Sequence, residues 1–211
     1  MTEDKELAAC LTGTLWGAVG LSGGPRATAL GHFPRSFERA FLAGLPLPAG
    51  GNLRAGQIVA VLDGDGRFQR HRDIAALKAA YDRHPSTRVY EDFGWGPGGE
   101  AWAALAGQHL TRLAGGPRVT VTAYESSFGD QEIGLHRDMA VNVIVQVDGA
   151  KCWEAGDGLD GTAGGEVRRV IMRPGDVLVV PRELAHLVTT PATPGSSVHL
   201  GFAINRDLSG P

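Results

Sequence analysis

Four stretches in the second half of the sequence have the composition of short β-strands, and they limit the fold more than any other feature. Arg118 to Tyr124 alternates apolar with polar residues, Met139 to Val147 is rich in valine, and two shorter runs follow at Asp176 to Val180 and Ser197 to Ile204. Turns containing glycine, aspartate and proline separate the four stretches. Short strands with regular turns predict a β-barrel or β-sandwich.

The first half, to about residue 117, has a different texture. Helical spacing of apolar residues predicts helices over Ser36 to Gly44, Arg72 to Tyr81 and Glu100 to Leu113, and Gln57 to Leu62 predicts a strand. We expect the first residues, with Cys10, to form a mobile terminus. A length of 211 residues suits one domain. We therefore expect a single domain over 1–211, with a mixed helical part at 1–117 and a barrel at 118–205.

Composition excludes several classes of function. A net charge of −3 gives no electrostatic reason to expect a nucleic acid partner, and two cysteines cannot form a disulfide framework. The N-terminus lacks the features of a signal peptide, and no apolar run is long enough to cross a bilayer. We expect a cytoplasmic protein with no membrane partner.

Two histidines and an aspartate have the spacing of a metal site. His136 and Asp138 are two residues apart at the start of the valine-rich strand, so their side chains share one face, and His186 follows 50 residues after His136. Two histidines and one carboxylate on one face of the metal are the ligands of non-haem Fe(II) oxygenases. Seven histidines also offer chance pairs. The spacing alone therefore leaves open that His136 and His186 are ordinary polar residues at strand ends.

The surrounding blocks resemble a known family. Gly134-Leu-His136-Arg-Asp138, Val143 to Trp153, Arg173 to His186 and Ser197-Val-His199-Leu, with Thr122-Ala-Tyr124 before them, occur in the order found in JmjC-type, cupin-fold 2-oxoglutarate oxygenases. The chain looks closest to the branch that hydroxylates ribosomal proteins. The resemblance implies a double-stranded β-helix of the jelly-roll or cupin type, mainly β with flanking helices and an N-terminal α/β lead-in.

The resemblance also implies roles for individual residues. His136, Asp138 and His186 would hold Fe(II), and Lys151 would pair with the distal carboxylate of the co-substrate, 2-oxoglutarate. Lys151 has the wrong parity on a straight strand, so a bulge at Asp148 and Gly149 would have to return it to the barrel interior. Further expected co-substrate contacts are Tyr124, His199, Thr122 in place of the family asparagine, and Asn142, which shares the parity of the metal ligands and could instead contact substrate.

By resemblance, the reaction consumes O₂ and 2-oxoglutarate, releases succinate and CO₂, and hydroxylates a C–H bond. We expect the substrate to be a side chain in a protein or in a peptide, including a ribosomally made one. Alternatives are hydroxylation of a free amino acid or other small molecule, N-methyl demethylation, and a non-catalytic cupin that binds a metal or ligand. The sequence ends at Pro211, soon after the last expected strand. We therefore expect it to lack the C-terminal domains of the ribosomal branch, which leaves a homodimer as an open expectation.

Overall fold

The computed structural model describes residues 2–21, 29–32, 58–93, 101–116, 118–161 and 163–205. The helix expected over Ser36 to Gly44 lies outside these residues. In chain order the elements are α1 (Thr2–Leu21), β1 (Ala29–His32), β2 (Ile58–Leu62), β3 (Phe68–His71), α3 (Ile74–Arg83), β4 (Arg88–Glu91), α4 (Ala101–Ala114), β5 (Thr120–Ser127), β6 (Val141–Gly149), β7 (Lys151–Ala155), the 3₁₀ turn η1 (Asp157–Asp160), β8 (Arg168–Met172), β9 (Asp176–Val180), β10 (His186–Thr189) and β11 (Ser196–Ile204).

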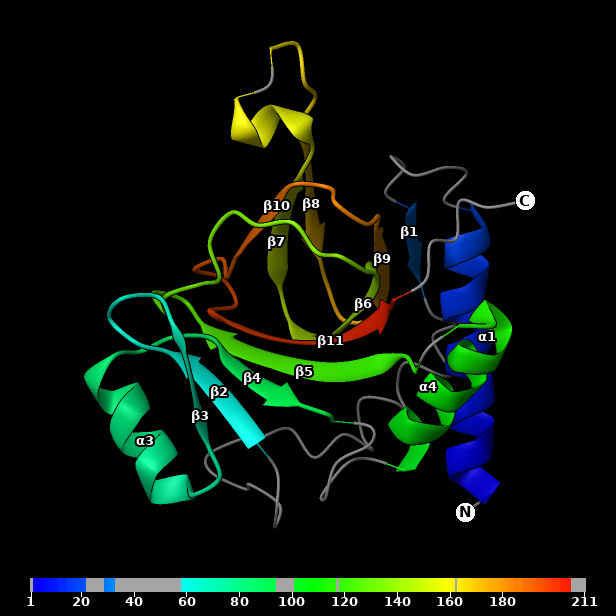
Figure 1. The fold of residues 1–211 in the computed structure, drawn as a ribbon, viewed down its shortest axis with the longest axis horizontal. Helices are drawn as coiled ribbons and strands as arrows, with labels where there is room; N and C mark the ends of the chain where they lie inside the picture. Colours follow the sequence, from blue (N-terminus) through cyan, green and yellow to red (C-terminus); the bar gives the residue numbers. More distant parts are fainter. Residues whose placement is uncertain are drawn as a thin grey trace.

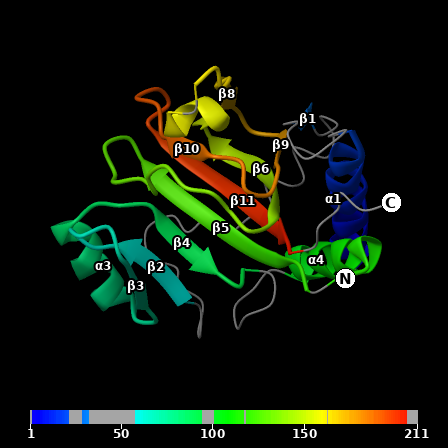
Figure 2. The ribbon, with the colours of Figure 1, turned by 45° about the horizontal axis from the view of Figure 1, so that its top comes forward.

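Two antiparallel sheets form the centre of the fold. The larger sheet has eight strands in the order β1-β9-β6-β11-β5-β4-β2-β3, and the smaller has three in the order β10-β7-β8. The smaller sheet lies over β6 and β11 of the larger one, as the two views show together (Figures 1 and 2). This is the mainly β, jelly-roll arrangement with flanking helices that the sequence predicts.

A sharp corner joins the two sheets between β6 and β7. The register of β6 on β11 shifts between Val198 and His199, so one residue of β6 bulges out of the ladder. Gly149 follows with φ +66°, and a Cβ there would lie 2.0 Å from the carbonyl oxygen of Ser196. Only glycine fits this position, because it needs both a left-handed backbone and a close approach to the facing strand. The corner starts the new strand at Lys151.

The helices cover the face of the large sheet that lies away from the small sheet. α1 and α4 pack together at one end of the sheet (Figure 1). Leu11 and Leu15 of α1 join Leu110 of α4 and alternate residues of the strands, such as Val143 and Phe202, in one buried core. The expectation of a mobile terminus around Cys10 was wrong, because the apolar residues of this segment have a sheet and a second helix to pack against. None of the helices in the described ranges is long and apolar enough to span a membrane.

Alternation along the strands separates the helix-facing core from the interior between the sheets. On β5, Val121 and Ala123 belong to the helix-facing core, whereas Thr122 and Tyr124 line a cavity on the opposite face. On β11, His199 and Gly201 line that cavity in the same way. Because side chains alternate between the two faces of each strand, polar side chains from neighbouring strands point into one enclosed space.

Candidate active site

A cavity of about 330 Å³ lies between the two sheets and holds all the residues singled out by their motifs. Apolar walls come from residues such as Ile144, Trp153 and Val188. The polar lining residues are Arg70, Thr87, Glu91, Thr122, Tyr124, Glu132, His136, Asp138, Asn142, Lys151, His186 and His199. A concave pocket in which polar groups converge between apolar walls is a usual form of ligand site.

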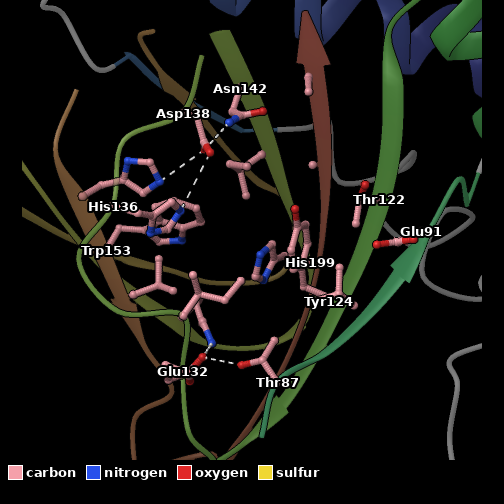
Figure 3. Close-up of a pocket in the computed structure, with 18 of the residues that line it drawn as sticks. Thr87, Glu91, Thr122, Tyr124, Glu132, His136, Asp138, Asn142, Trp153 and His199 are labelled. Carbon is pink, nitrogen blue, oxygen red and sulfur yellow. Dashed lines mark hydrogen bonds and ion pairs between the residues drawn. The ribbon is translucent and has the colours of Figure 1, made fainter. Parts of the chain in front are cut away.

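His136 and Asp138 lie at one end of this cavity (Figure 3), and His186 converges with them there. Their ligand atoms all lie within 4.8 Å of one another, close enough to bind one ion. The two histidines form an isolated antiparallel bridge, each backbone N–H donating to the other residue's carbonyl oxygen at 3.0 Å. This bridge places the two imidazoles side by side, with ring centroids 4.2 Å apart.

Hydrogen bonds orient the three side chains for metal binding. Nδ1 of His136 lies 2.7 Å from the carbonyl oxygen of Gly134, and Nδ1 of His186 lies 2.9 Å from that of Leu184. Because a carbonyl only accepts, each Nδ1 must carry the proton, which leaves Nε2 to face Asp138 as a ligand atom. Asn142 donates from Nδ2 to Oδ2 of Asp138, as second partners of metal-binding carboxylates commonly do.

The carboxyl group of Asp138 is held in its ionised form. Its pKa is lowered, chiefly by hydrogen bonding from His186 and further by the charges of both histidines and the amide of Asn142, while partial burial opposes the shift.

The local backbone at the first two ligands differs from the expectation. The valine-rich strand begins at Val141, so His136 and Asp138 lie in the irregular segment before it. Their convergence comes from the bridge between His136 and His186 and from the bond between Asp138 O and Glu183 N, at 2.8 Å. The prediction that strand alternation places His136 and Asp138 on one face was therefore wrong. The structure nevertheless brings the three side chains together.

Lys151 lies at the far end of the cavity and has no exposed surface. Its Nζ donates to both carboxylate oxygens of Glu132 at 2.7 Å, to Ser126 Oγ at 2.8 Å and to Thr190 Oγ1 at 3.0 Å. Burial lowers the pKa of Lys151, and the charge of Glu132 opposes that shift. The corner at Gly149 brings Lys151 inside, as the sequence argument required, although the sequence did not reveal its carboxylate partner.

The remaining expected contacts lie between the two ends of the cavity. The rings of Tyr124 and His199 are stacked, with centroids 4.7 Å apart and planes at 11° (Figure 3). Burial raises the pKa of Tyr124 to about 12, and burial followed by the charge of Lys151 lowers the pKa of His199 well below 6.5. Both side chains are therefore neutral at neutral pH. Thr122 and Asn142 also line the cavity, which places all eight predicted site residues on one surface.

Four polar residues of the cavity lining were missed by sequence reasoning. Glu132 comes from the loop between β5 and β6, and Thr87 Oγ1 donates to it at 2.7 Å. At the mouth, Arg70 Nε lies 2.9 Å from both carboxylate oxygens of Glu91. Neither acid belongs to a recognised motif. The only available signal for Glu132 was that a buried lysine requires a counter-charge somewhere nearby.

Comparison with known proteins identifies the region that carries this site. A family model described as the JmjC domain matches residues 108–208. This part of the chain is a JmjC domain. It contains the three candidate metal ligands, Lys151 and most of the cavity. A search of curated protein sequences finds no match.

Solved structures share the fold over most of this chain. A structure of YcfD, a ribosomal oxygenase from Escherichia coli, is 14% identical and matches with a TM-score of 0.56, covering 91% of this chain and 51% of that one. A structure of YcfD in complex with cobalt and 2-oxoglutarate is 15% identical and has the same TM-score, covering 91% and 52%. The chain thus spans about half the length of YcfD. At these identities the likeness establishes a shared cupin-like fold.

Proposed function

We propose that the protein is an Fe(II)- and 2-oxoglutarate-dependent oxygenase that hydroxylates a side chain of a protein or peptide. One observation carries the proposal. A two-histidine, one-carboxylate set and a completely buried lysine share one cavity of the JmjC domain. A simple metal-binding cupin has no need of a buried ammonium group in the same cavity as its ligands.

The donor set fits Fe(II). Two imidazole nitrogens and one carboxylate oxygen, with an open cavity on one side, are the ligands that such oxygenases present to iron. His186 is buried whereas the side chains of His136 and Asp138 are about one-third exposed, at 32% and 36%, so the site opens towards the cavity. Iron bound there with 2-oxoglutarate would supply the O₂-dependent oxidation of an unactivated C–H bond.

The chain's own residues would bind and orient the reactants. Asn142 holds the carboxylate of Asp138 in position, and Trp153 packs against His186 with ring centroids 5.8 Å apart, which shields one side of the ligand from water. Nδ1 of His199 is buried and has no hydrogen-bond partner among the described residues. A buried orphan nitrogen in a cavity is a position where a ligand's polar group is expected to bind.

The size of the cavity favours a side chain as substrate. About 330 Å³ is near the lower end of the range of about 300–1,000 Å³ seen for ligand pockets, and the co-substrate would take part of it. A single side chain entering from a protein or peptide needs less enclosed space than a whole metabolite. The ribosomal oxygenase activity named for YcfD makes ribosomal proteins one group of candidates, and ribosomally made peptides are another.

Succinate production tests the proposal. Purified protein with Fe(II), O₂ and 2-oxoglutarate should release succinate, and His136→Ala should abolish this release. A library of peptides, incubated in the same mixture, should contain members that gain the mass of one oxygen atom. Oxygen gain by free amino acids alone would support the small-molecule alternative, and a wild type that binds iron without forming succinate would refute the oxygenase proposal.

A further inference from the structure

The carboxylate of Glu132 is bound as a ligand's carboxylate would be. Lys151 Nζ contacts both of its oxygens at 2.7 Å, Thr87 Oγ1 donates to one, and Thr190 Oγ1 donates to the other at 2.7 Å. The side chain is only 14% exposed. Charge-assisted bonds to both oxygens make a specific, buried carboxylate site, which this chain fills with its own residue.

The described part of the cavity lining leaves no free cation for a second carboxylate. Its two cationic lining residues, Arg70 and Lys151, each contact the carboxylate of a lining glutamate, Glu91 and Glu132. Asp138 belongs to the metal end. A dicarboxylate that entered with Glu132 in place would put two carboxylates on one ammonium group. A buried charge without a counter-charge is costly, so the two carboxylates must compete.

We propose that Glu132 occupies the co-substrate's carboxylate site on Lys151 and sets co-substrate affinity and selectivity, because 2-oxoglutarate binds only by displacing it. This inference rests on the proposed function. A 2-oxo acid without a distal carboxylate does not need Lys151, so it binds without displacing Glu132. Glu132 therefore reduces the preference of the cavity for a dicarboxylate over a monocarboxylate.

The loop that carries Glu132 allows its side chain to leave while the backbone stays in place. The preceding Gln131 is fixed by N–H donation to Pro85 O and by acceptance from Thr87 N, both at 2.9 Å. His136, four residues after Glu132, is fixed by its bridge to His186. Rotation of the Glu132 side chain towards the open part of the cavity frees Lys151 without disturbing either the metal ligands or this anchor.

Binding measurements on Glu132→Gln test the proposal. Glutamine has nearly the same shape but no charge, so it holds Lys151 only weakly. Isothermal titration calorimetry of the Fe(II)-loaded protein, without O₂, would compare 2-oxoglutarate with 2-oxobutyrate. If Glu132 leaves Lys151 free in a tenth or less of wild-type molecules, the apparent affinity of the wild type is reduced by at least that factor. The variant should therefore bind 2-oxoglutarate at least about tenfold more tightly. The affinity for 2-oxobutyrate should not change.

Two further variants keep the result interpretable. Thr87→Val removes one donor to Glu132 but leaves the contacts of Lys151 intact, so it should also tighten 2-oxoglutarate binding even if Glu132→Gln folds poorly. Asp92→Asn is the matched control, since it removes the carboxylate of an exposed pair with Arg118 outside the cavity lining, and it should leave both affinities within about threefold of wild type. In metal-free protein, glutarate should raise the melting temperature of Glu132→Gln more than that of wild type.

The outcomes separate this proposal from the proposed function. Equal affinity for 2-oxoglutarate in wild type, Glu132→Gln and Thr87→Val would overturn the role of Glu132. The oxygenase proposal would still stand. Weaker binding by Glu132→Gln would also overturn it, because Glu132 would then help to bind the co-substrate. Failure of both 2-oxo acids to bind any Fe(II)-loaded variant would overturn both proposals.

Discussion

Removing the charge of Glu132 should destabilise the protein strongly and make its stability depend on pH. In Glu132→Gln the ammonium group of Lys151 stays completely buried, and its remaining partners among the described residues are the hydroxyls of Ser126 and Thr190 and the neutral amide. Breaking a buried ion pair by removing one partner costs about 3–5 kcal/mol. That is a large share of the stability of an ordinary domain, about 5–15 kcal/mol.

Deprotonation of Lys151 sets an upper limit on this cost. Neutralising a lysine whose ordinary pKa is 10.5 costs about 5 kcal/mol at pH 7, at about 1.4 kcal/mol for each unit of pKa. The variant cannot lose more than this through Lys151, because the neutral amine then replaces the buried charge. We therefore expect Glu132→Gln to lower the free energy of unfolding by about 3–5 kcal/mol at pH 7.

The pH dependence has a definite sign. Burial lowers the pKa of Lys151 in the wild type, and loss of the opposing charge of Glu132 lowers it further in the variant. Between the folded and unfolded pKa values the unfolded chain binds the extra proton, so stability rises with pH and is lost as pH falls. The deficit of Glu132→Gln should therefore shrink by up to about 1.4 kcal/mol per pH unit above pH 7.

Urea unfolding at pH 7 and pH 9, followed by circular dichroism, measures both effects. The double variant Lys151→Met with Glu132→Gln should regain most of the lost stability, because Ser126 and Thr190 still bond each other at 2.7 Å. Glu91→Gln, which breaks a pair whose arginine is 60% exposed, should cost far less than Glu132→Gln, because solvent screens the charges of an exposed pair. A loss below about 1 kcal/mol for Glu132→Gln, with no pH dependence, would refute the buried pair.

Three other predictions follow from the site and the corner beside it. Asn142→Leu removes the bond to Asp138 and should weaken Co(II) binding about 10- to 100-fold in a calorimetric titration; unchanged affinity would show that this bond does not position the ligand. Gly149→Ala should cost at least about 2 kcal/mol in urea unfolding, since its Cβ would collide with Ser196 O; a loss within the error of the measurement would contradict the corner. The low pKa of His199 means that the unfolded chain binds the proton first, so wild-type stability should fall as pH drops below about 6.5. His199→Gln should flatten that dependence by up to about 1.4 kcal/mol per pH unit, and an equal slope in both proteins would argue against a buried, neutral His199.

The elements with strong periodicity could be predicted closely from the sequence. The helix expected over Glu100 to Leu113 is α4 at Ala101–Ala114, and the strand expected at Ser197 to Ile204 begins one residue earlier, at Ser196. Both segments bury one regular face, so local pattern and tertiary packing agree. The N-terminal helix was missed because its apolar residues are not concentrated on one face. Their burial depends on packing against α4, which lies far away in the sequence.

Some residues of the site could be predicted from local sequence motifs, whereas others depend on contacts between distant parts of the chain. His136, Asp138, His186 and Lys151 lie in sequence blocks with recognisable spacing, and the structure brings them to one cavity. Glu132 reaches Lys151 from a loop with no repeat and no motif. Its role depends on which side chain lies across the barrel, and no spacing rule contains that information.

The most direct test of the central claim is an anaerobic absorption titration of the Fe(II)-loaded protein with 2-oxoglutarate. If the triad and the cavity bind the metal and the co-substrate together, wild type should develop a metal-to-ligand charge-transfer band in the visible region. His136→Ala, which loses a ligand from the bridge, should not develop that band. A band of equal intensity in His136→Ala, or none in wild type at saturating 2-oxoglutarate, would contradict the assignment of the site.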